Sequence, residues 1–130
     1  MKTEILYLTY ATVLTGVLWM PYILNMIVVR GIPDTVGYPE NPKPLAPWAA
    51  RMKAAHYNAV ENLVVFATLV LVANALGIGS QATQMSCMVY FWARVAHAVA
   101  HTFAIPWVRT LGFVVGFAAQ ACIAWQILAH

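Results

Sequence analysis

Long apolar stretches separated by short polar segments dominate this chain of 130 residues. A transmembrane helix needs about 20 consecutive, predominantly apolar residues, and four stretches of the sequence meet that requirement. The pattern therefore predicts an all-α integral membrane protein, a four-helix bundle formed by a single domain over residues 1–130. The expected spans cover approximately residues 4–29, 48–76, 81–104 and 107–130.

The polar segments indicate where the spans end. Residues 31–47 contain five prolines and two glycines, a composition that favours an ordered or semi-rigid loop over a continuous helix. Gly77 and Gly79 mark the end of the second span, and Pro106 follows the third. Pro21 lies inside the first span, where neighbouring helices can tolerate a proline.

The composition favours the same class of protein. Apolar residues make up 62% of the chain and charged residues 8%, with a mean hydropathy of +0.73, whereas soluble domains carry about 25% charged residues. The net charge of +3 rests on 7 Lys and Arg that are dispersed outside one loop, so we expect membrane lipid and no nucleic acid as a partner. Cys87 and Cys122 lie in apolar stretches, which favours buried thiols over a disulfide or a metal site.

Basic residues also predict the orientation of the spans. Four of them fall in the region 30–53 and Arg109 lies at the third connection, whereas the second connection, residues 77–81, carries no charge. Lys and Arg are enriched in cytoplasmic connections of membrane proteins. The first and third connections are therefore expected in the cytoplasm, and both termini on the opposite side.

Two of the spans contain polar residues that repeat at helical spacing. Each set falls within one narrow sector of a helix, about 80° wide for the second span. The second span contributes Arg51, Ala54, Asn58 and Glu61, and the third span contributes Tyr90, Arg94, His97 and His101. Ionisable residues inside a membrane are costly, so such a pattern indicates a function or a specific pairing.

Depth in the membrane predicts how the two sets meet. Counted from the second connection, Glu61 and Arg94 lie at the same level, about 20 Å inside the bundle. We therefore expect a buried Glu61–Arg94 ion pair, with Asn58 near His97 and Arg51 near His101 on the cytoplasmic side of that pair. Such an arrangement suits a polar anionic ligand that enters from the cytoplasm.

Two other interpretations of these residues remain open. A single buried ion pair can serve only to fix the register of a helical bundle. His97 and His101 have a spacing that can chelate a metal, with Glu61 as a third ligand. Arg94 lies on the same stripe and repels a cation, so no metal is expected.

The motifs that contain these residues resemble those of the MAPEG family, the membrane-associated proteins in eicosanoid and glutathione metabolism. Residues 51–61 match the second-helix signature, in which Ala-His-x-Asn-x-x-Glu follows basic residues. Residues 94–101 and 105–113 are similar to the third-helix and third-loop signatures. The match extends over essentially the whole chain and is closest to the bacterial branch, which implies a bacterial inner-membrane location.

The resemblance implies a homotrimer that binds glutathione near the cytoplasmic face, between adjacent subunits. It also assigns roles to individual residues. Arg109 and Thr110 would lie beside the thiol as the catalytic pair. The residues implied in glutathione binding are Arg30, Arg51, Asn58, Glu61, Arg94, His97 and His101.

Three positions depart from the family pattern. Ala54 and Tyr57 stand where catalytic members carry arginines, and His101 replaces a usual tyrosine. The leading hypothesis is a glutathione-dependent membrane transferase or peroxidase that acts on lipophilic electrophiles, with glutathione as co-substrate. The alternative is a non-catalytic protein of this fold that binds a lipid or small anion or has a structural role.

Overall fold

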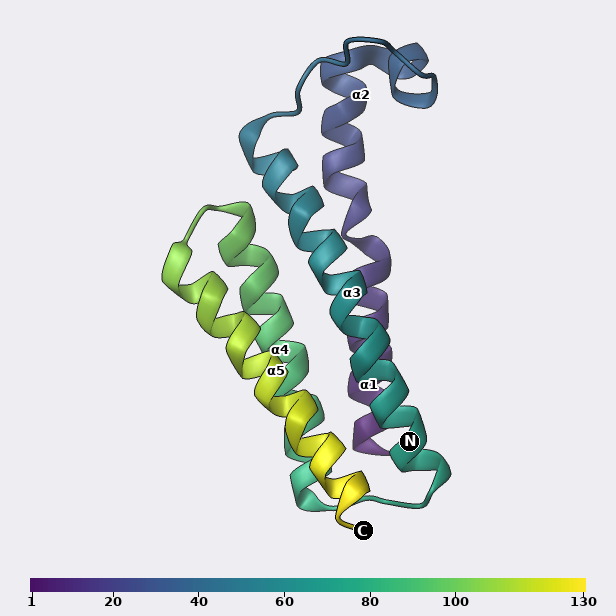
Figure 1. The fold of residues 1–130 in the computed structure, drawn as a ribbon. Helices are drawn as coiled ribbons and strands as arrows, with labels where there is room; N and C mark the ends of the chain where they lie inside the picture. The colour runs from purple at the N-terminus through teal and green to yellow at the C-terminus, as the bar shows by residue number, and fades with distance from the viewer.

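The structure, a computed structural model, describes residues 1–130 and is entirely helical (Figure 1). This confirms the all-α fold predicted from the pattern of apolar residues. The helices are α1 (Thr3–Val17), α2 (Trp19–Val36), α3 (Pro47–Ala75), α4 (Gln81–Thr102) and α5 (Pro106–Leu128).

Helices α1 and α2 form one bent rod that corresponds to the first predicted span. The interruption falls at Leu18, which keeps helical angles of φ −62° and ψ −20°. Pro21 explains it, because proline has no N–H to donate to the carbonyl of Val17 and its ring crowds that carbonyl. The rod therefore bends at this point without ending.

The rod extends further than the predicted boundary at residue 29. Regular helical geometry stops at Gly31, whose φ of 78° and ψ of 163° are not helical. Glycine adopts a positive φ without steric cost. One more turn, residues 32–36, follows before the Pro-rich loop, so the first connection is shorter than the expected 31–47.

Three segments are long and apolar enough to cross a membrane: Thr3–Val36, Pro47–Ala75 and Pro106–Leu128. The third predicted span, α4, does not meet this measure of apolarity because it carries a polar stripe. It has 22 residues, pairs along its length with α5, and is joined to its neighbours by short connections. Helix α3 ends at one end of the bundle and α5 begins at the opposite end (Figure 1). If both helices cross the bilayer, α4, which joins them, must cross it as well.

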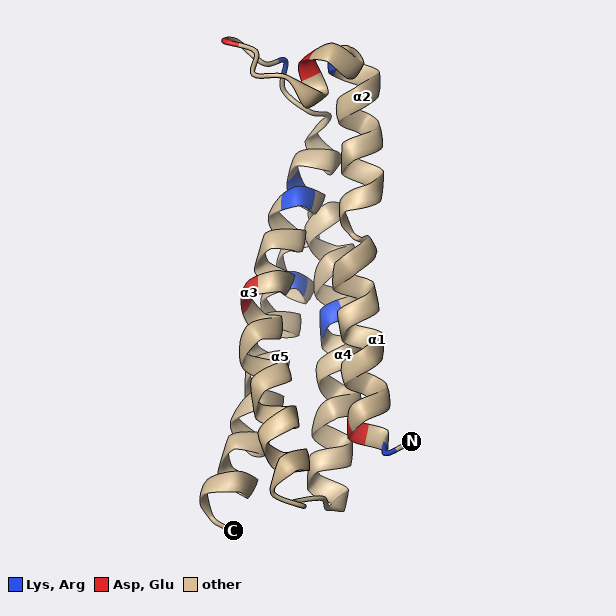
Figure 2. Ribbon diagram, turned by 90° about the vertical axis from the view of Figure 1, so that its right-hand side faces the viewer, with Lys and Arg blue, Asp and Glu red and all other residues tan.

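Both termini and the 76–80 connection lie at one end of the bundle, here called the termini end (Figure 1). The Pro-rich loop and the 103–105 connection lie at the other, the loop end. Figure 2 shows the charged residues concentrated towards the loop end, with few others apart from those beside the N-terminus. The first and third connections therefore lie at the same end of the bundle, whereas the side of the membrane that each end faces stays a prediction.

The apolar core is largest towards the termini end. Phe66 and Tyr90 are fully buried and stack with their ring centroids 3.7 Å apart. Ser80 caps α4 by accepting a hydrogen bond from the backbone N–H of Thr83. The hydroxyl of Thr83 donates to the carboxylate of Glu4 at 2.7 Å, which connects α1 to the start of α4.

Two glycines allow α5 to approach α4 closely. A Cβ on Gly112 would lie 3.1 Å from the carbonyl oxygen of Ala93 and 3.3 Å from the backbone nitrogen of His97. Gly116 faces Arg94 and Tyr90 at ordinary contact distance. This small-residue pair therefore serves packing between α4 and α5 inside one subunit.

Towards the loop end the bundle opens. Helix α1 packs against both α3 and α4, whereas α2 contacts α1 and α3 but not α4. Figure 1 shows α2 leaning away from the α4–α5 pair in this region, with α3 between them. Towards the loop end α3 therefore separates α2 from α4 and contacts both.

Candidate functional site

Helix α3 contributes two polar side chains that bond to α4. Arg51 Nε donates to the carbonyl oxygen of Thr102 at 2.9 Å. Arg94 Nη2 donates to Oδ1 of Asn58 at 2.7 Å. These two contacts set the rotation of α3 against α4 and confirm that the polar stripes of the two helices meet.

The predicted Glu61–Arg94 ion pair is wrong for this subunit. Arg94 is only 4% exposed and its partner on α3 is Asn58, whereas Glu61 lies exposed on the outer surface of the same helix. Residues three apart on a helix differ by about 60° in direction and by almost one turn in depth. The sequence gives the spacing along the stripe but not the rotation that decides which member faces α4.

A polar cavity of about 260 Å³ lies between α3, α4 and α5. Half of its lining is cationic or imidazole, and one aromatic ring completes it. The lining residues are Asn58, His97, His101, Arg109, Thr110 and Phe113. Five predicted site residues from three helices are thus brought together in one space, and Phe113 joins them.

A second cavity, of about 280 Å³, adjoins the first through two shared residues, His101 and Arg109. Arg51 lines it from α3, and the 103–105 connection closes it. Ala104 in that connection has a φ of 58°, an unusual value for a residue with a side chain. This tight turn places the first turn of α5, and with it Arg109, next to the end of α4.

Three nitrogens around these cavities are buried without a hydrogen-bond partner: Arg94 Nε, His97 Nδ1 and His101 Nδ1. The two imidazoles pack edge to face, with ring centroids 5.6 Å apart. Buried polar atoms are usually paired, and each exception costs free energy. Such a concentration of unpaired atoms is characteristic of a binding site and is uncommon in a purely structural core.

The charges in this region all have one sign. Arg51 and Arg109 line the cavities and Arg94 lies buried beside them, whereas no Asp or Glu lines either cavity. Cations gathered around one space give it a positive potential that attracts anions. The two cavities, called here the polar cavities, are therefore suited to an anionic ligand.

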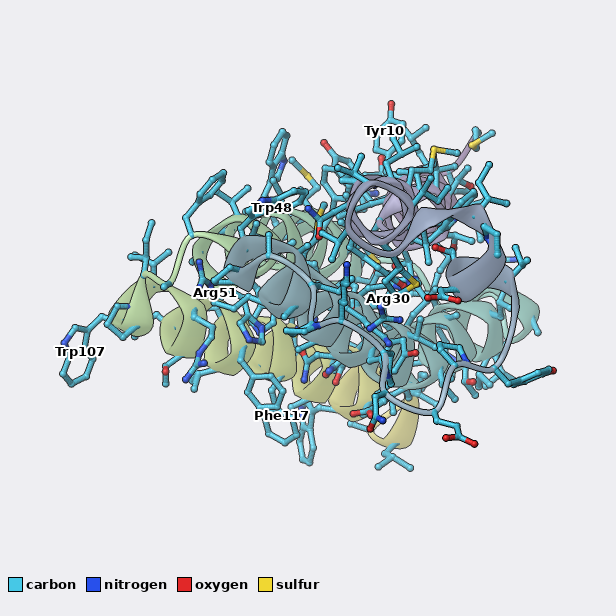
Figure 3. All side chains as sticks on the ribbon, turned by 90° about the horizontal axis from the view of Figure 1, so that it is seen from above. Tyr10, Arg30, Trp48, Arg51, Trp107 and Phe117 are labelled. Carbon is cyan, nitrogen blue, oxygen red and sulfur yellow. The ribbon has the colours of Figure 1, made fainter.

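Two of the predicted site residues lie elsewhere. Arg30 Nε donates to the carbonyl oxygen of Lys43 at 2.7 Å, within the first connection. Viewed from the loop end, Arg30 and Arg51 occupy separate places on the molecule (Figure 3). The second of these residues is Glu61. It is exposed on α3 and does not line the cavity that His97 and His101 share.

Sequence reasoning missed some members of the site. Phe113 lies one turn after Arg109 on α5, so its spacing could have placed it in the cavity. The carbonyl of Thr102 that accepts from Arg51 is a backbone atom and leaves no signal in the sequence. Tyr90, a member of the polar stripe, does not line the polar cavities but stacks on Phe66 in the core.

The motifs and the fold agree with one family of membrane proteins. A model of the MAPEG family matches residues 7–129. The chain belongs to the MAPEG family. No curated protein matches the chain. The family match covers most of α1 and all of α2 to α5, and with them every residue that lines the polar cavities.

Proposed function

We propose that this MAPEG protein is a glutathione-dependent membrane transferase or peroxidase that acts on lipophilic electrophiles. The observation that carries the proposal is the pair of polar cavities, which are lined by two arginines and two histidines and by no acidic side chain, with Arg94 buried beside them. Glutathione is a tripeptide with two carboxylates and a thiol, so it complements cations at several points. Membership of a family that includes glutathione transferases and peroxidases supports the same ligand.

Arg109 and Thr110 are the proposed catalytic pair. Both line the first cavity, and the hydroxyl of Thr110 bonds back to the carbonyl of Pro106 at a long 3.3 Å. A guanidinium beside a thiol favours the thiolate and so lowers the pKa of the glutathione sulfur. The thiolate then forms a bond to the electrophilic carbon, the leaving group departs with its electron pair, and the thiol proton passes to solvent.

The remaining cations would hold the carboxylates. Arg51 keeps its terminal nitrogens free because only Nε is used by Thr102. Asn58, His97 and His101 would orient the peptide by hydrogen bonds. Lipophilic electrophiles dissolve in the bilayer, so they would approach the thiolate from the membrane.

We propose further that the protein is a homotrimer in a bacterial inner membrane, with both termini on the non-cytoplasmic side. Glu61 supports an assembly, because a carboxylate exposed on a membrane-spanning helix is costly unless a neighbouring subunit covers it. In such an assembly Glu61 and Arg30 of one subunit would complete the glutathione site of the next. Cross-linking in detergent, followed by denaturing electrophoresis, tests the subunit number.

The experiment for the activity uses purified protein, glutathione and a chlorodinitrobenzene-type electrophile. We expect conjugation above the uncatalysed rate, and an Arg109→Leu variant that loses about 100-fold in kcat/KM. Lys43→Leu, which removes one cation outside the cavities, is the matched control and should retain activity. No conjugation and no thiolate absorbance in the ultraviolet would contradict the catalytic proposal.

A non-catalytic binding protein is the second candidate, and Ala54 and Tyr57 favour it. Both are exposed on α3 and neither offers a cation at the positions where catalytic members carry arginine. A thermal-shift titration with glutathione shows whether the protein binds this ligand, as both candidates require. Glutathione at 100 times its Kd should stabilise the fold by about 2.7 kcal/mol, and binding without conjugation would favour the second candidate.

A further inference from the structure

A polar contact outside the cavities joins α2 to α3. The hydroxyl of Tyr22 and Nδ1 of His56 lie 2.7 Å apart and form the one side chain–side chain hydrogen bond between these helices. Tyr22 is 4% exposed and follows Pro21, where the rod bends, while His56 is half-buried. Neither residue lines a polar cavity, and the proposed chemistry does not use them.

His56 lies on the same short segment of α3 as the site residues but faces the other way. It precedes Asn58 by two residues and follows Arg51 by five, which are offsets of about 200° and 140° around the helix. Asn58 and Arg51 bond to α4, whereas His56 bonds to α2. Helix α3 is thus held by hydrogen bonds from two opposite sides.

The surroundings make the contact with α2 important. Helices α2 and α4 make no close backbone contact. The other hydrogen bond from α2 reaches only the start of α3, where Asn25 Oδ1 accepts from the backbone N–H of Ala46 at 3.0 Å. The apolar cluster nearest to it is small, formed by Leu18, Ala59 and Ala98. Small apolar side chains such as alanine oppose the rotation of a helix only weakly, because their contacts have no preferred direction. A short hydrogen bond depends on its angle and therefore opposes rotation.

We propose that Tyr22 and His56 are positioning residues that fix the rotation of α3 and so hold Arg51 and Asn58 in the polar cavities. The proposal takes glutathione as the ligand from the function proposed above. The Tyr22–His56 hydrogen bond on which it is built does not depend on that function. Without the hydrogen bond, α3 spends part of its time in rotations that do not bind. The apparent Kd then rises by the inverse of the competent fraction, while the chemistry of the bound complex is unchanged.

The first experiment measures glutathione binding and turnover in Tyr22→Phe. We expect a rise of about five- to tenfold in the Kd and KM for glutathione, with kcat at saturating glutathione within twofold of the parent. Tyr10→Phe is the matched control, because Tyr10 is an exposed tyrosine of the same rod whose hydroxyl bonds to no group in the subunit. A lowered Tm with unchanged Kd and KM would overturn the proposal, since it would show a merely structural role.

Rescue by a conservative variant provides the second test. Asn can place Oδ1 where His places Nδ1, so His56→Asn should retain the bond to Tyr22 and bind glutathione like the parent. His56→Leu has a similar volume but no acceptor, and it should reproduce the weaker binding of Tyr22→Phe. Equal binding by the Asn and Leu variants would overturn the role of the hydrogen bond.

A ligand-free measurement separates this proposal from the proposed function. Tyr22 and Asn58 bond to different helices, so independent effects on Tm should add. If Tyr22 acts through the rotation of α3, the Tm loss of the double variant Tyr22→Phe/Asn58→Ala is smaller than the sum of the single losses. Strict additivity would overturn the proposal, whereas coupling in a protein that does not bind glutathione would support it and contradict the proposed function alone.

Discussion

The two ends of α4 differ in whether their buried polar groups have hydrogen-bond partners. At the termini end, Ser80 and Thr83 form a capping box, and the Thr83 hydroxyl also reaches Glu4, so every group has a partner. At the loop end, Arg94 and His97 are just as buried, yet each keeps a nitrogen without a partner. Both regions belong to one helix and one bundle, and they differ in whether the subunit satisfies its own polar atoms.

This difference indicates that the termini end of α4 contributes to stability, whereas the loop end contributes to binding. Paired caps and stacked aromatics at the termini end lower the free energy of the folded state. Unpaired donors and an uncompensated cation at the loop end raise it, which is a common property of binding sites. Substitutions at the two ends should therefore have effects of opposite sign, and that expectation can be tested.

The largest effect is expected from the core at the termini end. Phe66→Ala removes a fully buried ring that stacks on Tyr90, and such a change typically costs about 3–5 kcal/mol. Thermal unfolding in detergent should show a large fall in Tm, with the glutathione-induced shift retained in the folded fraction. Phe117→Ala is the control, since Phe117 projects outward (Figure 3) and should change stability little. Equal Tm losses for the two variants would mean that the stack contributes nothing.

The opposite sign is expected at Arg94. This guanidinium is 4% exposed and has no carboxylate partner in the subunit, and replacing buried charges by apolar residues is often neutral or stabilising by about 1–4 kcal/mol. Arg94→Leu should therefore raise or preserve Tm without ligand and abolish the shift produced by glutathione. In this variant Asn58 Oδ1 loses the hydrogen bond from Arg94 but keeps the one that Asn62 Nδ2 donates to it.

The matched control for this change is Lys53→Leu, which removes a cation that lines neither polar cavity. It should leave the glutathione-induced shift intact. A strong loss of Tm in Arg94→Leu would contradict the expectation. It would indicate that a carboxylate from a neighbouring subunit neutralises Arg94.

Periodicity was sufficient for much of the fold. The positions of α3, α4 and α5 follow from apolar stretches and Pro or Gly breaks to within two residues at each end. Helical spacing also placed His97 and His101 on the face that lines the cavities. These features depend on local sequence alone, because backbone hydrogen bonds must be satisfied within each span.

Features that depend on the rotation and bending of helices could not be predicted in the same way. The choice of Asn58 over Glu61 as the partner of Arg94 depends on the rotation of α3 about its axis. The Tyr22–His56 contact depends on the bend that Pro21 introduces, and the direction of that bend cannot be read from the spacing of residues. Arg30 was placed in the site by resemblance, as the contribution of a neighbouring subunit, and Glu61 by helical spacing as well as by resemblance. Neither lines the polar cavities of its own subunit.

The smallest effect is expected at the cap of α4, where the paired groups of the termini end can be tested without disturbing the core. Thr83→Val keeps the shape of the side chain but removes the hydroxyl that accepts from Ser80 N at 2.9 Å and donates to Glu4. Loss of a cap costs about 1 kcal/mol, and Glu4 loses its donor as well, so Tm should fall modestly. Thr68→Val is the control, because the exposed Thr68 hydroxyl bonds only to its own helix. Glutathione binding should be unchanged in both variants, since the polar cavities lie at the other end of α4; a weakened ligand shift in Thr83→Val alone would mean that the two ends are coupled.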